Sequence, residues 1–360
     1  MKAAVLREVG KPLEIEEISI SKPEPREVLI RTSAAGVCHS DLHFVEGSYP
    51  YMLPTVLGHE SAGIVEEVGS DVRYVAKGDH VITCLSAFCG HCKHCLTGHM
   101  SLCQSPEVQR EPGRPPRLSQ NETVMNQFLN LSSYAEQMIV HEHALVKIRE
   151  DMPLDVASLI GCGVTTGVGA VHHTAGVEPG SSVAVVGCGG VGLACINGAA
   201  IAGAGRIIAI DTVASKLELA KRFGATDAVD VTTGDPVEQV RELTGGGVDY
   251  SFEAIGLKQT SEQAFRMLGR GGTATIIGMI PVGTMVELHG VDFLAEKKMQ
   301  GCTMGSNRFR VDMPNYVDFY LNGKLHLDDM VSQRLPLERV NEALAALKQG
   351  EVARSVLMFD

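Results

Sequence analysis

The chain has 360 residues, of which 44% are hydrophobic and 21% charged, and its formal net charge is −12. This length predicts two domains, and the acidic balance argues against nucleic acid or an anionic membrane as a partner. The N-terminal sequence MKAAVLREVG lacks a signal-peptide pattern, and no run of about 18 apolar residues predicts a membrane span. Without a secretory context, the ten cysteines favour metal binding over disulfides, so we expect a cytoplasmic protein.

The first half of the chain predicts short strands and loops. Glycine and proline recur, no long helical period appears before about residue 150, and segments 28–33 and 62–68 suit strands. Three segments place a zinc-type ligand beside glycine: GVCHSDLH (36–43), GHE (58–60) and GCG (161–163). Taken singly, each ligand has a simpler interpretation as a buried cysteine or a hydrogen-bonded histidine. Spacing alone does not show that the three converge.

A cluster of four cysteines lies between two of these segments: Cys89, Cys92, Cys95 and Cys103. The spacing C-x2-C-x2-C-x7-C suits a tetrahedral zinc site with no open position, which is a structural site. An iron–sulfur cluster fits poorly, because the last spacing differs and no proline follows Cys103. A metal-free thiol cluster is the other alternative. His91 and His94 lie within the cluster, but four cysteines suffice, so we place both histidines on the surface.

The rest of the chain predicts a long loop, followed by strands that alternate with helices. Residues 104–132 are rich in Pro, Arg and Asn and predict a long ordered loop. From about residue 181, strands alternate with helices, which predicts a parallel sheet with crossover helices. The predicted strands are 181–187, 206–210, 228–231, 248–253, 273–278 and 286–288, and the helices are 191–203 and 215–223. Two helical stretches, 314–322 and 337–349, and a strand at 355–359 follow residue 304.

The sequence GCGGVG (187–192) fits the dinucleotide pattern G-x-G-x-x-G at Gly187, Gly189 and Gly192. It follows a predicted strand and opens a helix, whose N-terminus offers N–H groups to phosphates. The next predicted strand ends at Asp211, 19 residues beyond Gly192. A carboxylate there would accept hydrogen bonds from ribose hydroxyls and repel a 2′-phosphate, which favours NAD over NADP. A glycine-rich turn without a ligand is the alternative interpretation.

These motifs together resemble the zinc-dependent alcohol dehydrogenases of the medium-chain dehydrogenase/reductase family, in the liver-type or class III-like branch. The segment GHESAGIVEEVGSDV (58–72) matches the family's zinc signature, and the other motifs follow in the family's order over essentially the whole chain. The resemblance implies an α/β protein with a GroES-like, mostly-β catalytic domain and a Rossmann, doubly wound parallel sheet. The expected domains are a catalytic domain at 1–160 with a zinc lobe at 86–105, an NAD-binding domain at 161–303, and a C-terminal return to the catalytic domain at 304–360.

The resemblance also assigns a catalytic zinc to Cys38, His59 and Cys162. Zinc acts there as a Lewis acid that lowers the pKa of an alcohol. Asp41 is the carboxylate that orients His59, and Glu60 lies behind the metal and exchanges with a ligand. With the four-cysteine cluster, this implies two zinc ions per chain.

The remaining implied roles concern the proton and the cofactor. Ser40 accepts the substrate proton, and His43 passes it toward solvent through the cofactor ribose. His39, which stands where many relatives carry arginine, contacts the pyrophosphate together with Arg354. The other expected cofactor contacts are Gly190, Val191, Lys216, Ile255 and Ile277, although Lys216 also suits a solvated helix. Candidates for the substrate pocket, or alternatively for ordinary core, are Tyr49, Leu85, Phe128 and Leu129.

We therefore expect an enzyme that transfers a hydride between a primary or secondary alcohol, or its aldehyde or ketone, and NAD, as a homodimer or homotetramer. The alternative within the family is a thiol-dependent formaldehyde dehydrogenase that oxidises an S-hydroxymethyl thiol. It would need anion-binding residues near the pocket mouth, and Arg110, Arg114 and Arg117 are candidates unless they belong to a solvated loop. A non-enzymatic nucleotide-binding protein and a metal-free quinone reductase are further alternatives. The complete set of metal ligands argues against both.

Overall fold

The computed structural model describes residues 1–111, 113–350 and 352–359. The chain divides into two compact units, each with its own hydrophobic core. Unit 1 comprises Met1–Gly163, Arg308–Gly323 and Leu327–Asp360, and unit 2 comprises Val164–Asn307 and Lys324–His326. The chain thus leaves unit 1 after Gly163, returns at Arg308, and contributes one further short segment, Lys324–His326, to unit 2.

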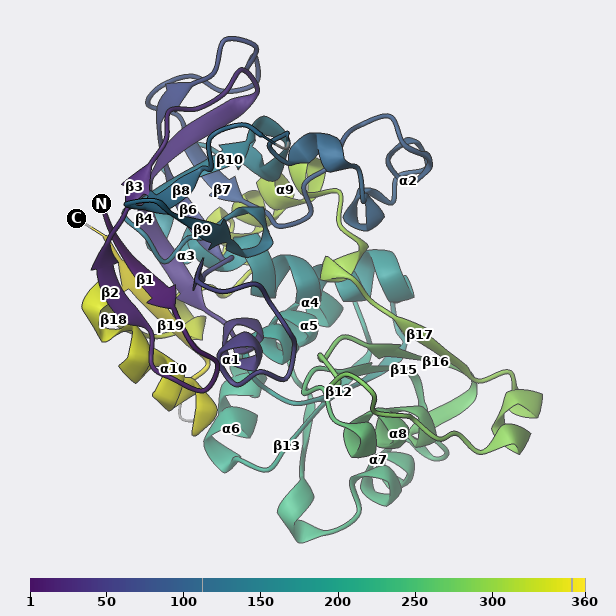
Figure 1. The fold of residues 1–360 in the computed structure, drawn as a ribbon. Coiled ribbons are helices and arrows are strands. Elements are labelled where there is room, and N and C mark those ends of the chain that lie inside the picture. The colour runs from purple at the N-terminus through teal and green to yellow at the C-terminus, as the bar shows by residue number, and fades with distance from the viewer. Residues whose placement is uncertain (112, 351, 360) are drawn as a thin grey trace. The chain divides into compact units, whose positions relative to one another are not determined.

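Unit 1 is mostly β, as the GroES-like expectation requires (Figure 1). One sheet has the order β2-β1-β5-β9-β8-β3, and the other has the order β11-β7-β6-β4-β19-β18, with β10 also paired to β4. The predicted strands at 28–33, 62–68 and 355–359 lie in β4, β6 and β19. The strands are β1 (Lys2–Leu6), β2 (Glu14–Glu17), β3 (Ser19–Ile20), β4 (Glu27–Val37), β5 (Thr55–Val56), β6 (Ser61–Val68), β7 (His80–Thr83), β8 (Leu118–Gln120), β9 (Thr123–Gln127), β10 (Gln137–His141), β11 (Leu145–Lys147), β18 (Val331–Pro336) and β19 (Arg354–Met358).

The helices of unit 1 are α1 (His39–Val45), α2 (Lys93–Leu96), α3 (Leu154–Leu159), α9 (Phe309–Leu321) and α10 (Val340–Lys348). The predicted helix at 314–322 begins earlier than expected, at Phe309, and Pro314 lies inside it. Proline removes one helical hydrogen bond, but Phe309, Met313 and Tyr316 are buried, and this packing offsets the loss. The predicted helix at 337–349 starts as a 3-10 turn, Leu337–Arg339, before α10.

The segment 104–132, which we predicted to be a long ordered loop, contains two strands. Strands β8 and β9 form an antiparallel hairpin inside it, and β8 also pairs with β3. The two strands have only three and five residues, so they are too short to show the alternation that identifies longer strands. Asn121 adopts a left-handed conformation at the turn, with φ of 53°, and asparagine tolerates this conformation well. That residue was the one signal of a hairpin in the sequence.

Unit 2 holds a parallel sheet with the strand order β14-β13-β12-β15-β16-β17. Numbered along the chain, this is the order 3-2-1-4-5-6 of the doubly wound dinucleotide fold, so this prediction is confirmed. Helices α5 to α8 pack against the sheet (Figure 1), and its central strands β12 and β13 are mostly apolar and buried. The elements are α4 (Thr165–Gly169), β12 (Ser182–Val186), α5 (Gly190–Ile201), β13 (Arg206–Asp211), α6 (Ala214–Arg222), β14 (Asp227–Asp230), α7 (Pro236–Thr244), β15 (Val248–Glu253), α8 (Lys258–Arg266), β16 (Leu268–Ile276) and β17 (Lys298–Gly301).

The strand predicted at 286–288 does not form, and β17 takes the place beside β16 instead. Strand β16 already pairs with β15 on its other side, so no position in the ladder remains for residues 286–288. Leu288 packs against the core of unit 2 without joining the sheet. The apolar residues that suggested a strand therefore serve packing rather than strand pairing.

The GCG segment at 161–163 is part of a helix. It lies in a π-helical stretch, Ile160–Val164, between α3 and α4. The helical run Leu154–Ala175 is long enough to cross a membrane, and its most apolar 18 residues have a mean hydropathy of 1.5, but 83% of these residues are buried inside the protein. Such burial is typical of a core helix.

Candidate active site

Cys38, His59 and Cys162 converge in unit 1. Their ligand atoms all lie within 4.8 Å of one another, and the three side chains are buried. The Nε2 atom of His59 is buried and has no hydrogen-bond partner among residues 1–111, 113–350 and 352–359. Two sulfurs and an imidazole nitrogen with an unused lone pair fit a zinc site with three protein ligands. The convergence that spacing alone did not show is therefore present.

Helix α1 begins at these ligands. Cys38 is its N-cap residue, and the Asp41 carboxylate accepts a hydrogen bond from the Cys38 N–H at 3.2 Å, which closes a capping box. Asp41 also accepts from His59 Nδ1 at 3.0 Å. This bond sets the tautomer of His59, because a proton on Nδ1 leaves Nε2 free to bind metal. The sequence C-x-x-D thus organises both the helix start and the metal site.

Glu60 and Arg354 lie directly behind the three ligands. Glu60 Oε1 is 3.4 Å from Arg354 Nε, and both side chains are almost completely buried. An Arg354 nitrogen also lies 3.9 Å from Cys38 Sγ. A side chain at Gly163 would place its Cβ 2.6 Å from the guanidinium, so glycine beside Cys162 is needed for this close approach. Arg354 therefore belongs to the metal centre, and its contact with pyrophosphate remains a prediction.

The protonation of these groups is strongly coupled. Burial raises the pKa of Glu60 to about 7, although Arg354 opposes the shift. Burial alone would lower the pKa of His59, but Asp41 raises it well above 6.5. The Cys162 thiol holds the pKa of Cys38 well below its usual range. Metal binding here releases protons and must weaken as the pH falls.

The predicted proton relay lies on α1. Ser40 and His43 are three residues apart, so they are neighbours on one helix face. Ser40 Oγ lies 3.8 Å from Cys38 Sγ, and burial lowers the pKa of the half-buried His43 below 6.5. His39, the first residue of the helix, is exposed. The arrangement gives a hydroxyl beside a metal ligand and an imidazole that is neutral at pH 7.

The candidate pocket residues separate into two groups. Phe128 is fully buried, and its ring centroid lies 5.9 Å from that of His59. Tyr49 lies 6.0 Å from the His43 ring. Leu129 packs with Phe128 in one hydrophobic cluster, whereas Leu85 packs against a different one. Phe128, Leu129 and Tyr49 thus remain good candidates for the pocket, and Leu85 fits the alternative interpretation as core.

The turn after β9 is held in an unusual conformation. Leu129, Asn130 and Ser132 have φ values of 49°, 62° and 60°, which are uncommon for residues other than glycine. The hydroxyl of Tyr51 donates to the Gln127 carbonyl at 2.9 Å and accepts from the Leu129 N–H at 3.1 Å. Sequence reasoning missed Tyr51, because nothing in its surroundings along the chain indicates this contact.

The four lobe cysteines also converge, with all ligand sulfurs within 4.8 Å of one another. The Sγ atoms of Cys92 and Cys95 are 3.5 Å apart. Backbone N–H groups point at two of the sulfurs, as thiolates require. His91 pairs with Glu107 at 2.7 Å, and both are more than half exposed. His94 is exposed as well, so both histidines lie on the surface as expected.

The glycine-rich loop has the geometry that its sequence predicts. Gly187 has a φ of 94°, which only glycine adopts readily. A side chain at Gly192 would collide with the Gly187 carbonyl, whereas a Cβ at Gly189 would meet open space. Helix α5 starts at Gly190, directly after this loop. The loop therefore combines a tight turn, close packing and room for a phosphate at a helix N-terminus.

Asp211 has a second role that the sequence did not indicate. Its carboxylate accepts hydrogen bonds from the Cys188 N–H at 2.8 Å and the Val213 N–H at 3.0 Å. It thereby ties the glycine-rich loop to the end of β13. Ile255 and Ile277 are held by one residue at the end of β15, because Glu253 accepts from the Ile255 N–H through its side chain and from the Ile277 N–H through its carbonyl.

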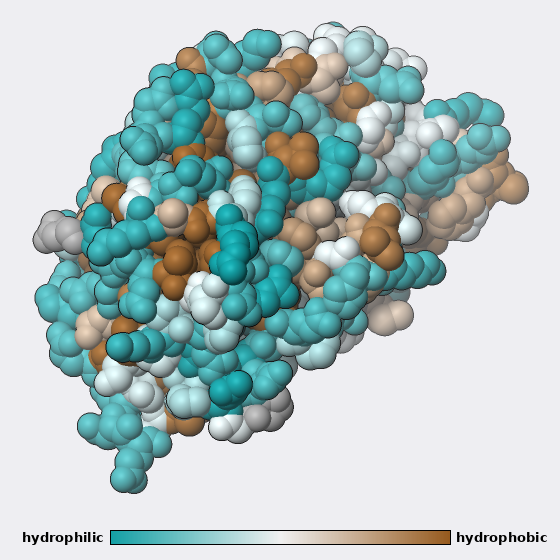
Figure 2. All heavy atoms as spheres, turned by 90° about the horizontal axis from the view of Figure 1, so that it is seen from above, coloured by the Kyte–Doolittle hydropathy of each residue, from teal (hydrophilic) through white to brown (hydrophobic). Residues whose placement is uncertain are grey.

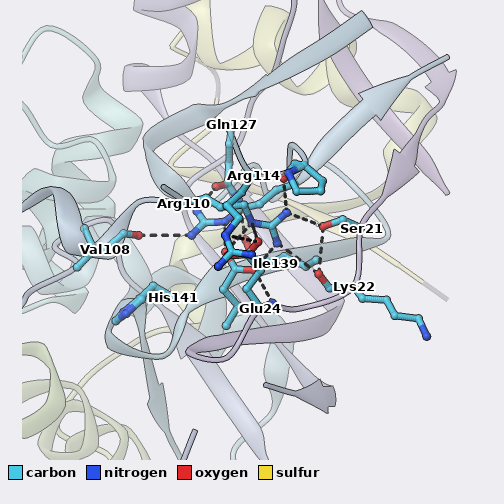
Figure 3. Close-up of polar contacts among 12 residues, drawn as sticks. Ser21, Lys22, Glu24, Val108, Arg110, Arg114, Gln127, Ile139 and His141 are labelled. Atoms are coloured by element: carbon cyan, nitrogen blue, oxygen red, sulfur yellow. Dashed lines mark hydrogen bonds and ion pairs between the residues drawn. The ribbon is translucent and has the colours of Figure 1, made fainter. Parts of the chain in front are cut away.

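Arg110 and Arg117 do not form a free anion site. Both are buried ion-pair partners of Glu27, with Arg117 Nε 2.7 Å from its carboxylate. Arg110 also donates to Ser21 Oγ at 2.9 Å and to the carbonyls of neighbouring loops (Figure 3). Neither earlier interpretation, an anion site or a solvated loop, holds for these two residues. Arg114 is more than half exposed, and its ion contacts with Glu24 and Glu111 are long, at 3.9 Å and 4.0 Å.

A doubly wound dinucleotide fold, a β unit with a three-ligand metal site and a four-cysteine lobe define a zinc-containing oxidoreductase. Family comparisons agree. Residues 24–150 match the alcohol dehydrogenase GroES-like domain, and residues 190–322 match the zinc-binding dehydrogenase domain. The protein belongs to the zinc-dependent alcohol dehydrogenase family, so its metal sites and NAD-binding Rossmann domain are those of that family.

Individual relatives span the whole chain. An S-(hydroxymethyl)glutathione dehydrogenase of Synechocystis sp. is 41% identical and covers 99% of both chains. Alcohol dehydrogenase 1 of Pisum sativum is 36% identical and covers 100% of this chain and 97% of its own. The crystal structure of benzyl alcohol dehydrogenase from Acinetobacter calcoaceticus has a TM-score of 0.94 and 33% identity, covering 100% of this chain and 99% of its own.

Proposed function

We propose that the protein is an NAD-linked dehydrogenase of primary or secondary alcohols. One observation carries the proposal: three buried zinc-type ligands, whose group includes no fourth ligand among the described residues, lie beside a serine and histidine on α1. The open position suits a substrate oxygen. A non-enzymatic role would not require this combination of metal ligands and proton-accepting groups.

The residues divide the chemistry among them. Zinc bound at Cys38, His59 and Cys162 would supply the Lewis acidity that lowers the pKa of a substrate hydroxyl. Ser40 accepts the hydroxyl proton and His43 carries it away, so the proton leaves without the site opening to water. The buried ring of Phe128 helps to exclude water beside the ligands.

The direct test is a panel of alcohols and aldehydes, assayed with NAD and with NADP on protein whose zinc has been counted. We expect about two zinc ions per chain, from one closed and one open ligand set, and NAD-dependent turnover of at least one alcohol. Fully active protein with one zinc, or protein with both zincs that oxidises no alcohol in a broad panel, would contradict the proposal.

His43 should act as a relay and not as a ligand. His43→Gln is expected to keep both zincs and to lower the turnover of alcohol by roughly ten- to a thousandfold at neutral pH. The neutral, proton-accepting imidazole exists above the pKa of His43, which burial places below 6.5. Turnover of the unaltered enzyme should therefore fall as the pH drops through that value, and His43→Gln should lose this dependence.

Two further results refine this test. Added buffer bases should restore part of the turnover that His43→Gln loses. His289 is exposed, so His289→Gln is the matched control, and its turnover and zinc content should not change. Unchanged turnover of His43→Gln would make His43 a bystander, and the loss of one zinc would make it a ligand.

Preference for NAD should depend on the charge of Asp211. The Cys188 and Val213 N–H groups donate to different oxygens of Asp211, so Asp211→Asn keeps an acceptor for only one of them and removes the charge that opposes a 2′-phosphate. We expect the ratio of kcat/KM for NAD over NADP to narrow by roughly ten- to a hundredfold, which corresponds to a like-charge cost of a few kcal/mol. Asp249→Asn, near the amino end of β15, is the control. If the unaltered protein uses NADP as well as NAD, the role of Asp211 is disproved.

A thiol-dependent formaldehyde dehydrogenase is the second candidate. It is supported by the names of relatives such as the Synechocystis protein. Against it, Arg110 and Arg117 are committed to Glu27 and are not available for a glutathione carboxylate. Measuring the turnover of formaldehyde with and without glutathione distinguishes the two candidate functions. A strict requirement for the thiol would favour the second candidate over the first.

We also propose that the protein associates with further copies of itself. We place it in the cytoplasm, where reducing conditions keep the zinc ligands reduced. Much of the face in Figure 2 is hydrophilic. In contrast, residues 282–294 of unit 2 carry apolar side chains that are each at least 52% exposed: Val282, Met285, Val291, Phe293 and Leu294. Such a concentration favours an interface with another copy, and we expect a dimer or tetramer by light scattering.

A further inference from the structure

Tyr134 is a buried tyrosine whose place in the site no sequence motif indicates. Its side chain is fully buried, and its hydroxyl lies 2.8 Å from Asp41 Oδ2 and 3.4 Å from the Gly36 carbonyl. A hydroxyl has one proton to donate. The shorter distance and the charge of the carboxylate direct that proton to Asp41.

The hydrogen bonds of Asp41 form a complete set. Oδ1 accepts from His59 Nδ1 at 3.0 Å and from the Gly58 N–H at 3.2 Å. Oδ2 accepts from Tyr134 and from the Cys38 N–H at 3.2 Å. Four donors fill the acceptor sites of an ionised carboxylate. Oδ2 has one side-chain donor, Tyr134, and its hydrogen bond is shorter than the one from the Cys38 N–H.

Tyr134 is itself fixed in place. Its N–H donates to the Leu57 carbonyl at 3.0 Å, and its carbonyl accepts from the Ala4 N–H at 2.8 Å. A Cβ on Gly58 would lie 2.5 Å from the Tyr134 ring, so the ring packs directly against the residue before His59. Burial and Asp41 both raise the pKa of Tyr134 well above 10, so the hydroxyl keeps its proton. It is therefore a permanent donor.

We infer that Tyr134 is a positioning residue for the catalytic zinc: its hydroxyl holds the Asp41 carboxylate in the orientation that directs His59 Nε2 toward the metal. Without that bond, Oδ2 keeps only its backbone donor, and the carboxylate is free to rotate away from His59. The inference depends on zinc binding by Cys38, His59 and Cys162. It does not depend on which alcohol the enzyme oxidises.

The test is the rate of zinc release to the chelator 4-(2-pyridylazo)resorcinol from zinc-loaded protein, measured without substrate. In Tyr134→Phe, zinc should leave the catalytic site about tenfold faster than in the unaltered protein, the lower end of the effect known for groups that orient metal ligands. Release from the four-cysteine lobe should not change. Cys38→Ser, which lacks the catalytic site, identifies the lobe phase.

Two controls separate positioning from general loosening. Tyr316→Phe removes another buried hydroxyl of unit 1, one that has no hydrogen-bond partner in the described part of the chain, and should leave both release phases unchanged. In an Asp41→Asn background, Tyr134→Phe should change release less than twofold, because the coupling runs through the carboxylate. This double-mutant comparison still tests the inference if either single variant is less stable than the unaltered protein.

Three results would overturn the inference. They are unchanged release in Tyr134→Phe, equal acceleration of both zinc phases, and the same tenfold effect in the Asp41→Asn background. None of these bears on the proposed function, which is tested separately by the zinc content and by the turnover of alcohols with NAD.

Discussion

Replacing Cys162 with serine is expected to give folded protein that retains the lobe zinc, loses the catalytic zinc and turns over alcohol roughly a thousandfold more slowly, a loss of about 4 kcal/mol in transition-state stabilisation. A serine hydroxyl is a poor zinc ligand at neutral pH, and His59 and Cys38 alone leave the site incomplete. Zinc analysis and steady-state kinetics on the same sample check both parts of this expectation.

Cys84→Ser is the matched control for that result. Cys84 is a buried thiol of unit 1, and burial raises its pKa to about 11, so it stays protonated and inert. This variant should keep two zincs and full activity per folded molecule. If Cys162→Ser kept two zincs, or if Cys84→Ser lost one, the ligand assignment would be wrong.

Replacing Cys92 should have the opposite profile, with a large effect on stability and a small one on chemistry. A closed four-cysteine site contributes free energy directly to folding. We expect Cys92→Ser to lose the lobe zinc and about 3 to 5 kcal/mol of stability, which lowers Tm by about 10 °C. Below that transition, the catalytic zinc and most of the turnover should remain.

His91→Gln is the control for the lobe. His91 is exposed and pairs with Glu107, so its loss should change neither the zinc content nor Tm appreciably, as is usual for a surface pair. An equal fall of Tm in Cys92→Ser and Cys162→Ser would contradict the division into a structural and a catalytic site.

The sequence by itself determined the features that depend on neighbouring residues. The glycine-rich loop, the strand before it and the helix after it occupy one short stretch, and each glycine has a local reason that the structure confirms. The four lobe cysteines lie within 15 residues, so their convergence needs only a compact loop. The strand–helix alternation predicted the doubly wound sheet for the same reason.

Some predictions failed where a partner distant in sequence decides the outcome. Residues 286–288 have strand-like composition, but β17 occupies the available edge of β16. Strand β8 looked like loop until β3 and β9 provided partners for its polar residues. Pro314 suggested a helix start, but buried neighbours on both sides keep it inside α9.

The metal centre could not be predicted from local sequence patterns. Its three ligands are spread over more than 100 residues, and only the family resemblance brought them together before the structure did. Local sequence could not show that Arg117 is neutralised by Glu27, or that Tyr134 completes the hydrogen bonds of Asp41. Buried charges and carboxylates take whichever donors the fold places beside them, so these partnerships were decided by the tertiary structure alone.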